Sequence, residues 1–319
     1  MNKGRLSVLV TGANGFVGRA VCEQLFARGH AVRGAARSQH EIPGGSFVQI
    51  ATIDENTDWS EALKGEVDVV IHLAARVHVM HDKSTNPLAE FRKVNTAGTE
   101  RLARAAAKSG VRRFVYVSSI KVNGEATVGS ERFTEQDVPK PQDPYAVSKW
   151  EAEQALHRIA KETGIEVVVV RPPLVYGQGV KGNFAQMLKV LSKGIPLPLS
   201  AVSNSRSLVY VENLADALIV CAIHPAATGQ TYLVSDGEDI STPDLLRSLA
   251  KAMGVQTRLF YFPPSWLLFL AKMLGKAAPL ERLTGSLKIN SDKIRNQLGW
   301  FQPFTLPAGL KKTVRNVHG

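Results

Sequence analysis

Cysteine is scarce in this chain, which has only Cys22 and Cys221 in 319 residues. Both lie in apolar patterns of helical period, so they are predicted to be small buried hydrophobes in a reducing compartment rather than a disulfide. No cysteine and histidine cluster has the spacing of metal ligands, and no metal site is expected. Disulfide-stapled secreted domains and zinc modules are therefore excluded as models for this sequence.

Long apolar runs are also lacking. The run Leu6–Val10 is too short for a signal peptide and leads directly into a glycine-rich loop, which predicts a first strand. The segment PSWLLFLAKMLGK near residue 270 is interrupted by Lys272 and falls short of spanning length. It is expected to form an amphipathic helix of a substrate lid or a subunit contact, with a membrane-surface helix as the alternative. The expected location is the cytoplasm, without stable membrane insertion.

Acidic residues are outnumbered, 28 against 39 lysines and arginines, and the net charge is +11. Such an excess can attract nucleic acid or an anionic membrane. The basic residues are scattered along the chain, however, without a helix-long run or interleaved aromatic residues. This distribution favours a solvated surface with some cations directed at a phosphorylated substrate, and no nucleic-acid partner is expected.

Short apolar runs alternate with helical patterns through the first half of the chain. The predicted strands are RLSVLV, AVRGAA, SFVQI, VDVVIHL, RFVYVSS and EVVVVR, separated by helices that include Phe16–Arg28, 87–109 and Tyr145–Thr163. The alternation predicts an α/β fold with a doubly wound parallel sheet of Rossmann type, covered by helices on both faces. Residues 1–171 are expected to form a dinucleotide-binding domain and 172–319 a smaller substrate-binding α/β portion, with 208–235 returning to the first domain.

Three glycines, Gly12, Gly15 and Gly18, stand between the first strand and the first helix. They would permit a tight turn, a close approach of the backbone to a pyrophosphate, and close packing of the helix on the strand. With Phe16 and Val17 they place free N–H groups at a helix N-terminus, where negative charge is favoured. A dinucleotide cofactor is the predicted ligand.

The end of the second strand bears on which dinucleotide binds. NAD sites usually carry an Asp or Glu there for the ribose hydroxyls. This strand ends instead in Ala36 and Arg37, and a guanidinium matches a 2′-phosphate. The alternative is an Arg37 that is merely solvated. NADP(H) is predicted over NAD(H).

Tyr145 and Lys149 stand four residues apart in the helical pattern DPYAVSKWEAEQAL, on the same face. A phenol with a pKa near ~10 is a poor acid or base at neutral pH. A fixed ammonium beside it favours the phenolate and brings proton transfer within reach. The spacing alone is a loose pattern, also compatible with two surface residues that share a helix face.

Several motifs in one order make the chain resemble the extended short-chain dehydrogenase/reductase family, the NAD-dependent epimerase/dehydratase group. They are TGANGFVG, DVVIHLAA, VNTAGTERL, FVYVSSIKVNGE, PYAVSK, RPPLVYG, RSLVYVENLADAL and QLGW. The resemblance implies that Tyr145 is the catalytic acid/base, that Lys149 binds the nicotinamide ribose and lowers the pKa of Tyr145, and that Ser119 bonds the reacting sugar oxygen. It also implies cofactor-side positions at Leu73, Ala74 and Ala75, and a helix-borne structural or cofactor-side contact at Asn95.

The family acts on nucleoside-diphosphate sugars, so the resemblance implies a UDP-sugar substrate held by the C-terminal portion. Arg206 would pair with the diphosphate, Arg282 is a second phosphate candidate, and Lys121 would meet a phosphate or a helix end. The remaining implied substrate contacts are His78, Asn183, Phe184, Leu197 and Leu199.

The chemistry is expected at C4 of the sugar, with three readings. The segments HLAARVHVM, SSIKVNGE and RPPLVYGQGVKGNF resemble bacterial enzymes that reduce UDP-4-keto-6-deoxy-N-acetylglucosamine for surface polysaccharide. With Arg37, this predicts a 4-keto reductase. The alternative is a 4-epimerase that holds NAD tightly. A regulator that binds NADP without turnover is the third reading, although Ser119, Tyr145 and Lys149 are all present. Family members commonly form homodimers through the helices that follow Pro87 and Tyr145, which is the expected assembly.

Overall fold

The computed structural model of the chain describes residues 4–39, 41–77, 84–275 and 277–315. A seven-stranded parallel sheet has the order β3-β2-β1-β4-β5-β6-β9, and a three-stranded sheet has the order β10-β8-β7. The strands are β1 (Ser7–Thr11), β2 (Ala31–Ala36), β3 (Ser46–Gln49), β4 (Val69–His72), β5 (Arg113–Val117), β6 (Glu166–Arg171), β7 (Leu174–Tyr176), β8 (Arg206–Tyr210), β9 (Thr231–Leu233) and β10 (Asp239–Ile240). All six predicted strands of the large sheet form, and the predicted α/β fold of Rossmann type is confirmed.

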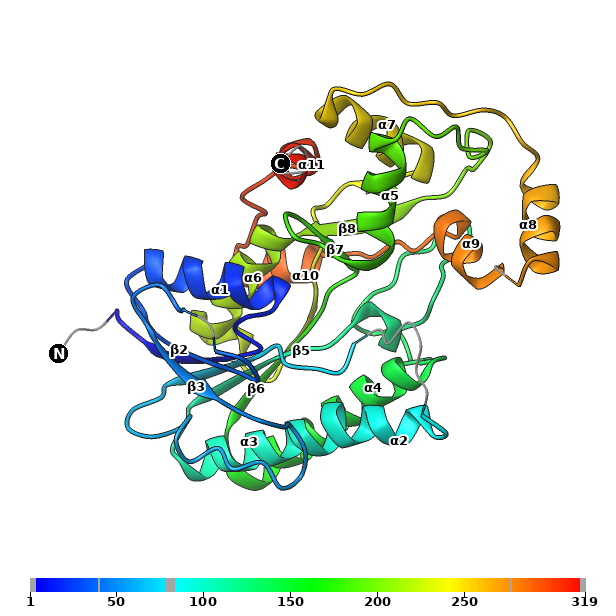
Figure 1. Cartoon of the computed structure of the whole chain (residues 1–319). Coiled ribbons are helices and arrows are strands. Elements are labelled where there is room, and N and C mark those ends of the chain that lie inside the picture. Colours follow the sequence, from blue (N-terminus) through cyan, green and yellow to red (C-terminus); the bar gives the residue numbers. More distant parts are fainter. Residues whose placement is uncertain (1–3, 40, 78–83, 276, 316–319) are drawn as a thin grey trace.

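Helices cover both faces of the large sheet (Figure 1). One face packs on α1 and α6, and the other on α3 and α4. The helices are α1 (Phe16–Ala27), α2 (Pro87–Phe91), α3 (Gly98–Lys108), α4 (Pro144–Thr163), α5 (Gly182–Ser192), α6 (Val211–Ile223), α7 (Thr242–Met253), α8 (Pro264–Met273), α9 (Ala277–Thr284), α10 (Asp292–Leu298) and α11 (Leu306–Val314). Because both faces are covered, β4 and most of β6 are buried and their sequences read as continuous apolar runs.

Between α2 and α3 the backbone forms a π-helical turn, Arg92–Ala97. It joins the two α-helices without a break and replaces the uninterrupted helix predicted for 87–109. Hydrophobic periodicity distinguishes helix from strand, but it does not register one extra residue within a turn.

The second sheet lies above the large one, where α5, α7 and α11 pack on it around Tyr176, Leu208 and Leu246 (Figure 1). Residues 208–235 were predicted to return to the large sheet. For α6 and β9 the structure shows this return, but β8 pairs with β7 and β10 and not with the large sheet. The apolar alternation of β8 is the same in either sheet, so the sequence did not identify its partner.

The topology brings three strand ends to one edge. In register, Thr11 pairs with His72, and His72 pairs with Tyr116. The strand order also reverses between β1 and β4, which is the position where open α/β sheets bind ligands. The loops after β1, β4 and β5 therefore lie together. They carry the glycine loop, Ala74 and Ser119 respectively.

Candidate active site

Tyr145 and Ser119 form the centre of the candidate site. Asp143 caps α4 by accepting a 2.7 Å hydrogen bond from the N–H of Ala146, which fixes the first turn of the helix and the start of its Tyr145 face. Ser119 lies two residues beyond β5, and its hydroxyl is hydrogen-bonded to the Tyr145 side chain. The structure thus brings together the hydroxyl and the phenol that sequence reasoning assigned to one sugar oxygen.

Lys149 lies one turn further along α4 and is 2% exposed. Its Nζ donates a 2.8 Å hydrogen bond to the carbonyl of Val117 at the end of β5. The same atom lies 4.6 Å from the ring centroid of Tyr116 and 5.9 Å from that of Tyr145. Burial lowers the pKa of Lys149 to about 7, against the opposing charge of Glu153. The ammonium is fixed next to the phenol and close to losing its proton at neutral pH.

The predicted lowering of the Tyr145 pKa is not found in this structure. Burial raises the pKa of Tyr145 to about 12, and the hydrogen bond with Ser119 offsets only part of that effect. The physical reason is that burial removes the phenol from water, which disfavours the phenolate, and the negative charge of Asp143 raises the pKa further. A bound polar substrate and cofactor would have to supply the stabilisation that water no longer gives.

A buried ion pair continues the same helix face. Glu153, four residues beyond Lys149, accepts hydrogen bonds of 2.9 and 2.5 Å from Arg171, and the two side chains are 0% and 4% exposed. Arg171 also donates a 2.9 Å bond to Asn123 Oδ1. Sequence reasoning missed Glu153, although its i+4 spacing from Lys149 was a signal for it.

The glycine loop has the close contacts expected of a dinucleotide cradle. Gly12 has φ +68°, and a Cβ on it would lie 3.0 Å from the backbone nitrogen of Ala74. A Cβ on Gly18 would lie 2.1 Å from the carbonyl oxygen of Gly12. Gly15 is exposed at the N-cap of α1, whose first N–H groups are open for an anion. The loop fits a pyrophosphate.

Not every predicted cofactor residue points into the crevice. The side chains of Phe16 and Val17 pack against the core around Tyr176 and Leu208, so their contribution to a cofactor is confined to the backbone. Leu73 packs on the core around β1 and α6, whereas Ala74 and Ala75 are half-buried at the end of β4. The N–H groups of Leu73 and Ala74 donate to Thr11 Oγ1, each over 3.2 Å.

Arg37 is exposed just beyond β2, at the position predicted to meet a 2′-phosphate. Its carbonyl accepts a 2.9 Å bond from Gln49 Nε2, which fixes the backbone and leaves the guanidinium at the surface. The neighbouring Ser38 hydroxyl accepts a 2.8 Å bond from Asn14 of the glycine loop. Asn14 and Ser38 were not predicted; they join the two segments that would hold an adenosine.

Asn95 is buried in the π-helical turn and links three segments. Its Oδ1 accepts a 2.8 Å bond from the N–H of Arg76, and its Nδ2 donates to the Arg76 carbonyl at 3.1 Å and to Ser148 Oγ at 3.0 Å. The predicted role was a helix-borne structural or cofactor-side contact. The geometry favours the structural role, because both the oxygen and the nitrogen of the Asn95 amide form hydrogen bonds that hold the loop after β4 against α4.

Lys121 is paired with protein carboxylates. Its Nζ forms ion pairs with Asp143, the cap of α4, and at 3.1 Å with Glu125. Of the two predicted alternatives, a phosphate or a helix end, the structure shows the helix end. The ion pair of Lys121 with Asp143 therefore holds the loop that bears Ser119 against the N-terminus of the helix that bears Tyr145.

Two predicted substrate residues are core residues. Phe184 is 1% exposed and stacks on Tyr176 with a 5.8 Å centroid distance, and Leu199 is 7% exposed in the same core. A side-chain contact of either with a nucleotide is therefore corrected to a packing role. Their neighbours differ, since Asn183 is exposed and Leu197 is half-buried. His78 lies outside the described residues.

The two candidate phosphate arginines meet through the backbone. Arg206 Nη1 donates to the carbonyls of Arg282 at 2.8 Å and Gly285 at 2.9 Å, while Arg282 is exposed on α9. Burial lowers the pKa of Arg206. Arg206 is thus oriented by α9 and the residues after it.

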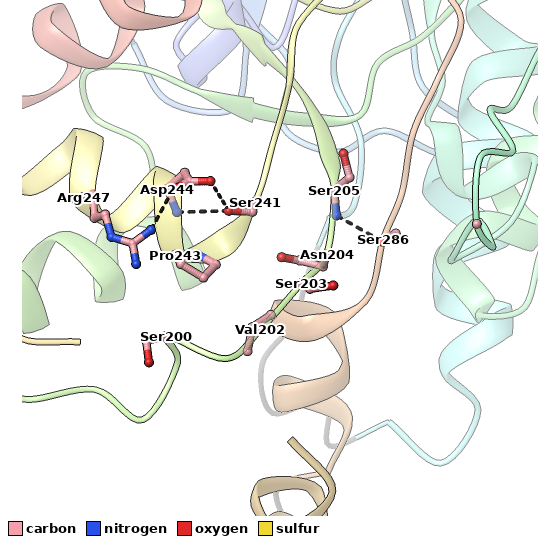
Figure 2. A pocket seen from close by; sticks show the side chains of 11 residues that line it. Ser200, Val202, Ser203, Asn204, Ser205, Ser241, Pro243, Asp244, Arg247 and Ser286 are labelled. Atoms are coloured by element: carbon pink, nitrogen blue, oxygen red, sulfur yellow. Dashed lines mark hydrogen bonds and ion pairs between the residues drawn. The ribbon is translucent and has the colours of Figure 1, made fainter. Parts of the chain in front are cut away.

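A cavity of about 540 Å³ opens beside this segment. Figure 2 shows its labelled lining, which comes from the stretch before β8, the start of α7 and Ser286. Asn204 and Ser205, which precede Arg206, border it opposite Ser241 and Asp244. Ser119, Tyr145 and Lys149 are not among its lining residues. The cavity is therefore a polar recess next to Arg206, apart from the residues that would carry the chemistry. The serine-rich run SNS at 203–205 was a sequence signal from which such a polar recess could have been predicted.

Comparison with known proteins identifies the family. The family model described as "NAD dependent epimerase/dehydratase family" matches residues 8–235. The chain belongs to this family. It is an enzyme of the extended short-chain dehydrogenase/reductase type, and its family uses a nicotinamide dinucleotide.

Individual relatives cover almost the whole chain. A "UDP-glucose 4-epimerase" of Vibrio cholerae is 43% identical over 97% of this chain and 94% of its own length. An "N-acetyl-alpha-D-glucosaminyl-diphospho-ditrans,octacis-undecaprenol 4-epimerase" of Escherichia coli O157:H7 is 25% identical over the same shares. Among solved structures, the UDP-glucose 4-epimerase of Thermotoga maritima with UDP-glucose has a TM-score of 0.78 at 24% identity and covers 98% of each chain. That likeness shows the fold.

Proposed function

We propose that this enzyme is a 4-epimerase of a UDP-hexose or UDP-N-acetylhexosamine, using a tightly held NAD. The observation that carries the proposal is the hydrogen-bonded pair of Ser119 and Tyr145 beside buried Lys149, at the sheet edge that also bears the glycine loop. The relative from Vibrio cholerae, 43% identical over nearly the full length, supports epimerisation rather than the predicted reduction.

In this proposal each residue has a defined task. Tyr145 takes the proton of the C4 hydroxyl and returns it to the same oxygen once the configuration at C4 has been inverted, while Ser119 holds that oxygen by a hydrogen bond. A nicotinamide dinucleotide, when bound, supplies hydride exchange at C4. Lys149 orients the cofactor's ribose and stabilises the phenolate. Arg206 pairs with the sugar-nucleotide diphosphate, with Arg282 close to it.

A 4-keto reductase using NADP(H) is the second candidate. The observation that favours it is the end of β2, where Ala36 is followed by the exposed Arg37 and no carboxylate occupies the expected position. A reductase consumes a reduced cofactor in each cycle, which suits NADPH. Its predicted place in surface polysaccharide synthesis, and the homodimer, stay predictions.

A paired assay separates the two candidates. Purified protein is incubated with UDP-glucose or UDP-N-acetylglucosamine without added reductant, and the C4 epimer is measured by NMR. In parallel, UDP-4-keto-6-deoxy-N-acetylglucosamine is supplied with NADPH and nicotinamide absorbance is followed. The proposal expects epimer in the first reaction and no NADPH oxidation in the second. The reverse result would establish the reductase, and neither product would overturn both.

A further inference from the structure

The outer face of α8 is apolar although it faces solvent. Trp266, Phe269, Leu270 and Met273 are 62%, 55%, 44% and 73% exposed. Their spacing of three, four and seven residues puts them on one continuous helix stripe, the pattern by which a helix usually buries a face. The inner side is filled by Leu267, which packs against the core around α5 and α7. The exposed stripe therefore does not pack against the core of the described chain.

The stripe continues into neighbouring residues. Tyr261 before α8 and Leu274 after it are 74% and 72% exposed. Figure 1 places α8 at the margin of the molecule beside α9, with the linker from α7 running out to it. Within the described chain, many of the exposed large hydrophobic side chains are concentrated in this short segment. A patch of this kind marks an interaction surface.

The charge around the stripe is positive. Among the described residues from Val255 to Ser286 there are three basic residues, Arg258, Lys272 and Arg282, against the single acidic Glu281. Lys272 is exposed and flanks the stripe on α8 itself. A lysine so placed can extend its ammonium past apolar neighbours to a phosphate while its stem stays in hydrocarbon. Aromatic and aliphatic residues with flanking cations suit the headgroup boundary of an anionic bilayer.

A second copy of the chain fits this surface less well. A two-fold contact sets the same patch against itself, so the positive charges of Lys272 and Arg282 would face a partner surface of the same sign. The indole of Trp266, with an apolar body and one N–H donor, is suited to a boundary that is apolar on one side and wet on the other.

We infer that the outer face of α8 binds the surface of an anionic phospholipid bilayer. The helix has 10 residues, so it would lie in the interface plane. Among the described residues no helix is long and apolar enough to cross a membrane. Through α9, whose Arg282 carbonyl accepts from Arg206, the docked surface is continuous with the proposed diphosphate site. The inference does not depend on which sugar the enzyme uses.

Vesicle flotation of the full-length protein tests it. Vesicles of phosphatidylglycerol and phosphatidylethanolamine are compared with pure phosphatidylcholine at low and high salt. Wild-type protein should float with the anionic vesicles, and the double variant Trp266→Ser/Phe269→Ser should bind at least about tenfold more weakly. Lys272→Glu should weaken binding at low salt only. The matched controls are Phe301→Ser, at a side chain 69% exposed, and Lys311→Glu on α11, and neither should change binding.

Three outcomes would overturn the inference. The first is that wild-type protein does not float with anionic vesicles. The second is that flotation is unchanged in both the double variant and Lys272→Glu. The third is that wild-type protein binds no vesicles but self-associates, and the double variant loses this self-association, which would make the face a contact between copies of the chain. Turnover of a water-soluble UDP-sugar should be the same in wild-type and double variant. If the proposed function is wrong, the turnover assay shows it, and the result of the vesicle flotation is not affected.

Discussion

At the scale of single residues, the candidate site depends on groups that burial has shifted away from their ordinary protonation behaviour. Tyr145 is held neutral by burial, and Lys149 is brought close to neutrality. Both shifts have the same cause, because each group has exchanged water for protein. We expect a bound polar ligand to replace part of this lost solvation and so favour proton transfer in the site.

Tyr145→Phe should remove the acid/base and leave the ring. We expect kcat to fall by about 10²–10⁴-fold with cofactor retention unchanged, because the phenol acts in the chemical step. Tyr261→Phe, at an exposed tyrosine, is the matched control and should retain full rate. Steady-state kinetics on the epimer product give the comparison, and a Tyr145→Phe enzyme of normal rate would refute the assigned role.

Lys149→Met should stabilise the ligand-free protein near neutral pH. The pKa of about 7 in the folded protein lies below the ordinary lysine value of 10.5, so between these values the unfolded chain binds more protons and wild-type stability rises with pH. The variant should lose this rise and have a higher Tm at pH 7, while turnover is abolished. Thermal melts from pH 6 to 10 measure it. A pH dependence identical to wild type would contradict the shifted pKa.

Sequence reasoning located the chemical residues better than the binding residues. Ser119, Tyr145 and Lys149 meet because strand ends and a helix face have fixed geometry that a pattern of residues can encode. Phe184 and Leu199 were misplaced because an apolar side chain in an irregular segment fits a core or a ligand wall equally well. Lys121 could not be resolved, since its carboxylate partner Asp143 is 22 residues away.

At the scale of elements, the strand–turn–helix unit of β1 and α1 is built around contacts that exclude any side chain. A Cβ on Gly18 would overlap the Gly12 carbonyl. Only a displacement of α1 would relieve that overlap, and α1 packs on α6 over the sheet. The cofactor loop is therefore coupled to the packing of a whole helix.

Gly18→Ala should displace the start of α1 and weaken the cofactor cradle. We expect at least about tenfold lower dinucleotide affinity with a lowered Tm, since the added methyl meets backbone rather than a flexible side chain. Gly4→Ala, where a Cβ meets nothing within 4 Å, is the control and should change neither. Cofactor titration by fluorescence and thermal melts measure both effects. Equal affinity in the two variants would argue against the cradle.

The elements that sequence patterns predicted worst are the short ones. β10 has two residues and β7 has three, too few to show a period. Their pairing is decided by contacts far along the chain, such as Ser207 with Asp239. Periodicity was sufficient for β1 to β6, which are four to six residues long and separated by long helices or loops.

At the scale of the whole molecule, Asp236 joins the two sheets. It follows β9 of the large sheet and accepts hydrogen bonds from Tyr176 Oη at 2.7 Å, the Tyr210 N–H at 3.0 Å and Asn213 Nδ2 at 2.8 Å. Tyr176 and Tyr210 belong to the small sheet, and Asn213 to α6. Burial raises the pKa of this carboxyl. One side chain thus fixes the small sheet relative to the large one.

Asp236→Ala should remove the acceptor that three buried donors share. We expect a loss of about 3 kcal/mol or more in the free energy of unfolding, given the usual cost of unsatisfied buried groups. Asp292→Ala, at an exposed carboxylate with a 3.7 Å ion pair, should cost little and serves as the control. Urea unfolding followed by circular dichroism gives both values. A cost equal to that of the control would show that the junction lies elsewhere.

The π-helical turn at Arg92–Ala97 has a consequence for insertions and deletions in this protein. Such a turn equals an α-helix with one residue added, so a deletion there would restore a regular helix without breaking it. Because the wide turn takes up the extra residue, the same deletion would keep the faces of α2 and α3 and change the side-chain directions mainly within the turn itself. Asn95 would then leave Ser148 and the Arg76 backbone. In an alignment, a relative that lacks this one residue should therefore also lack the amide bridge, and must hold its β4 loop by other means.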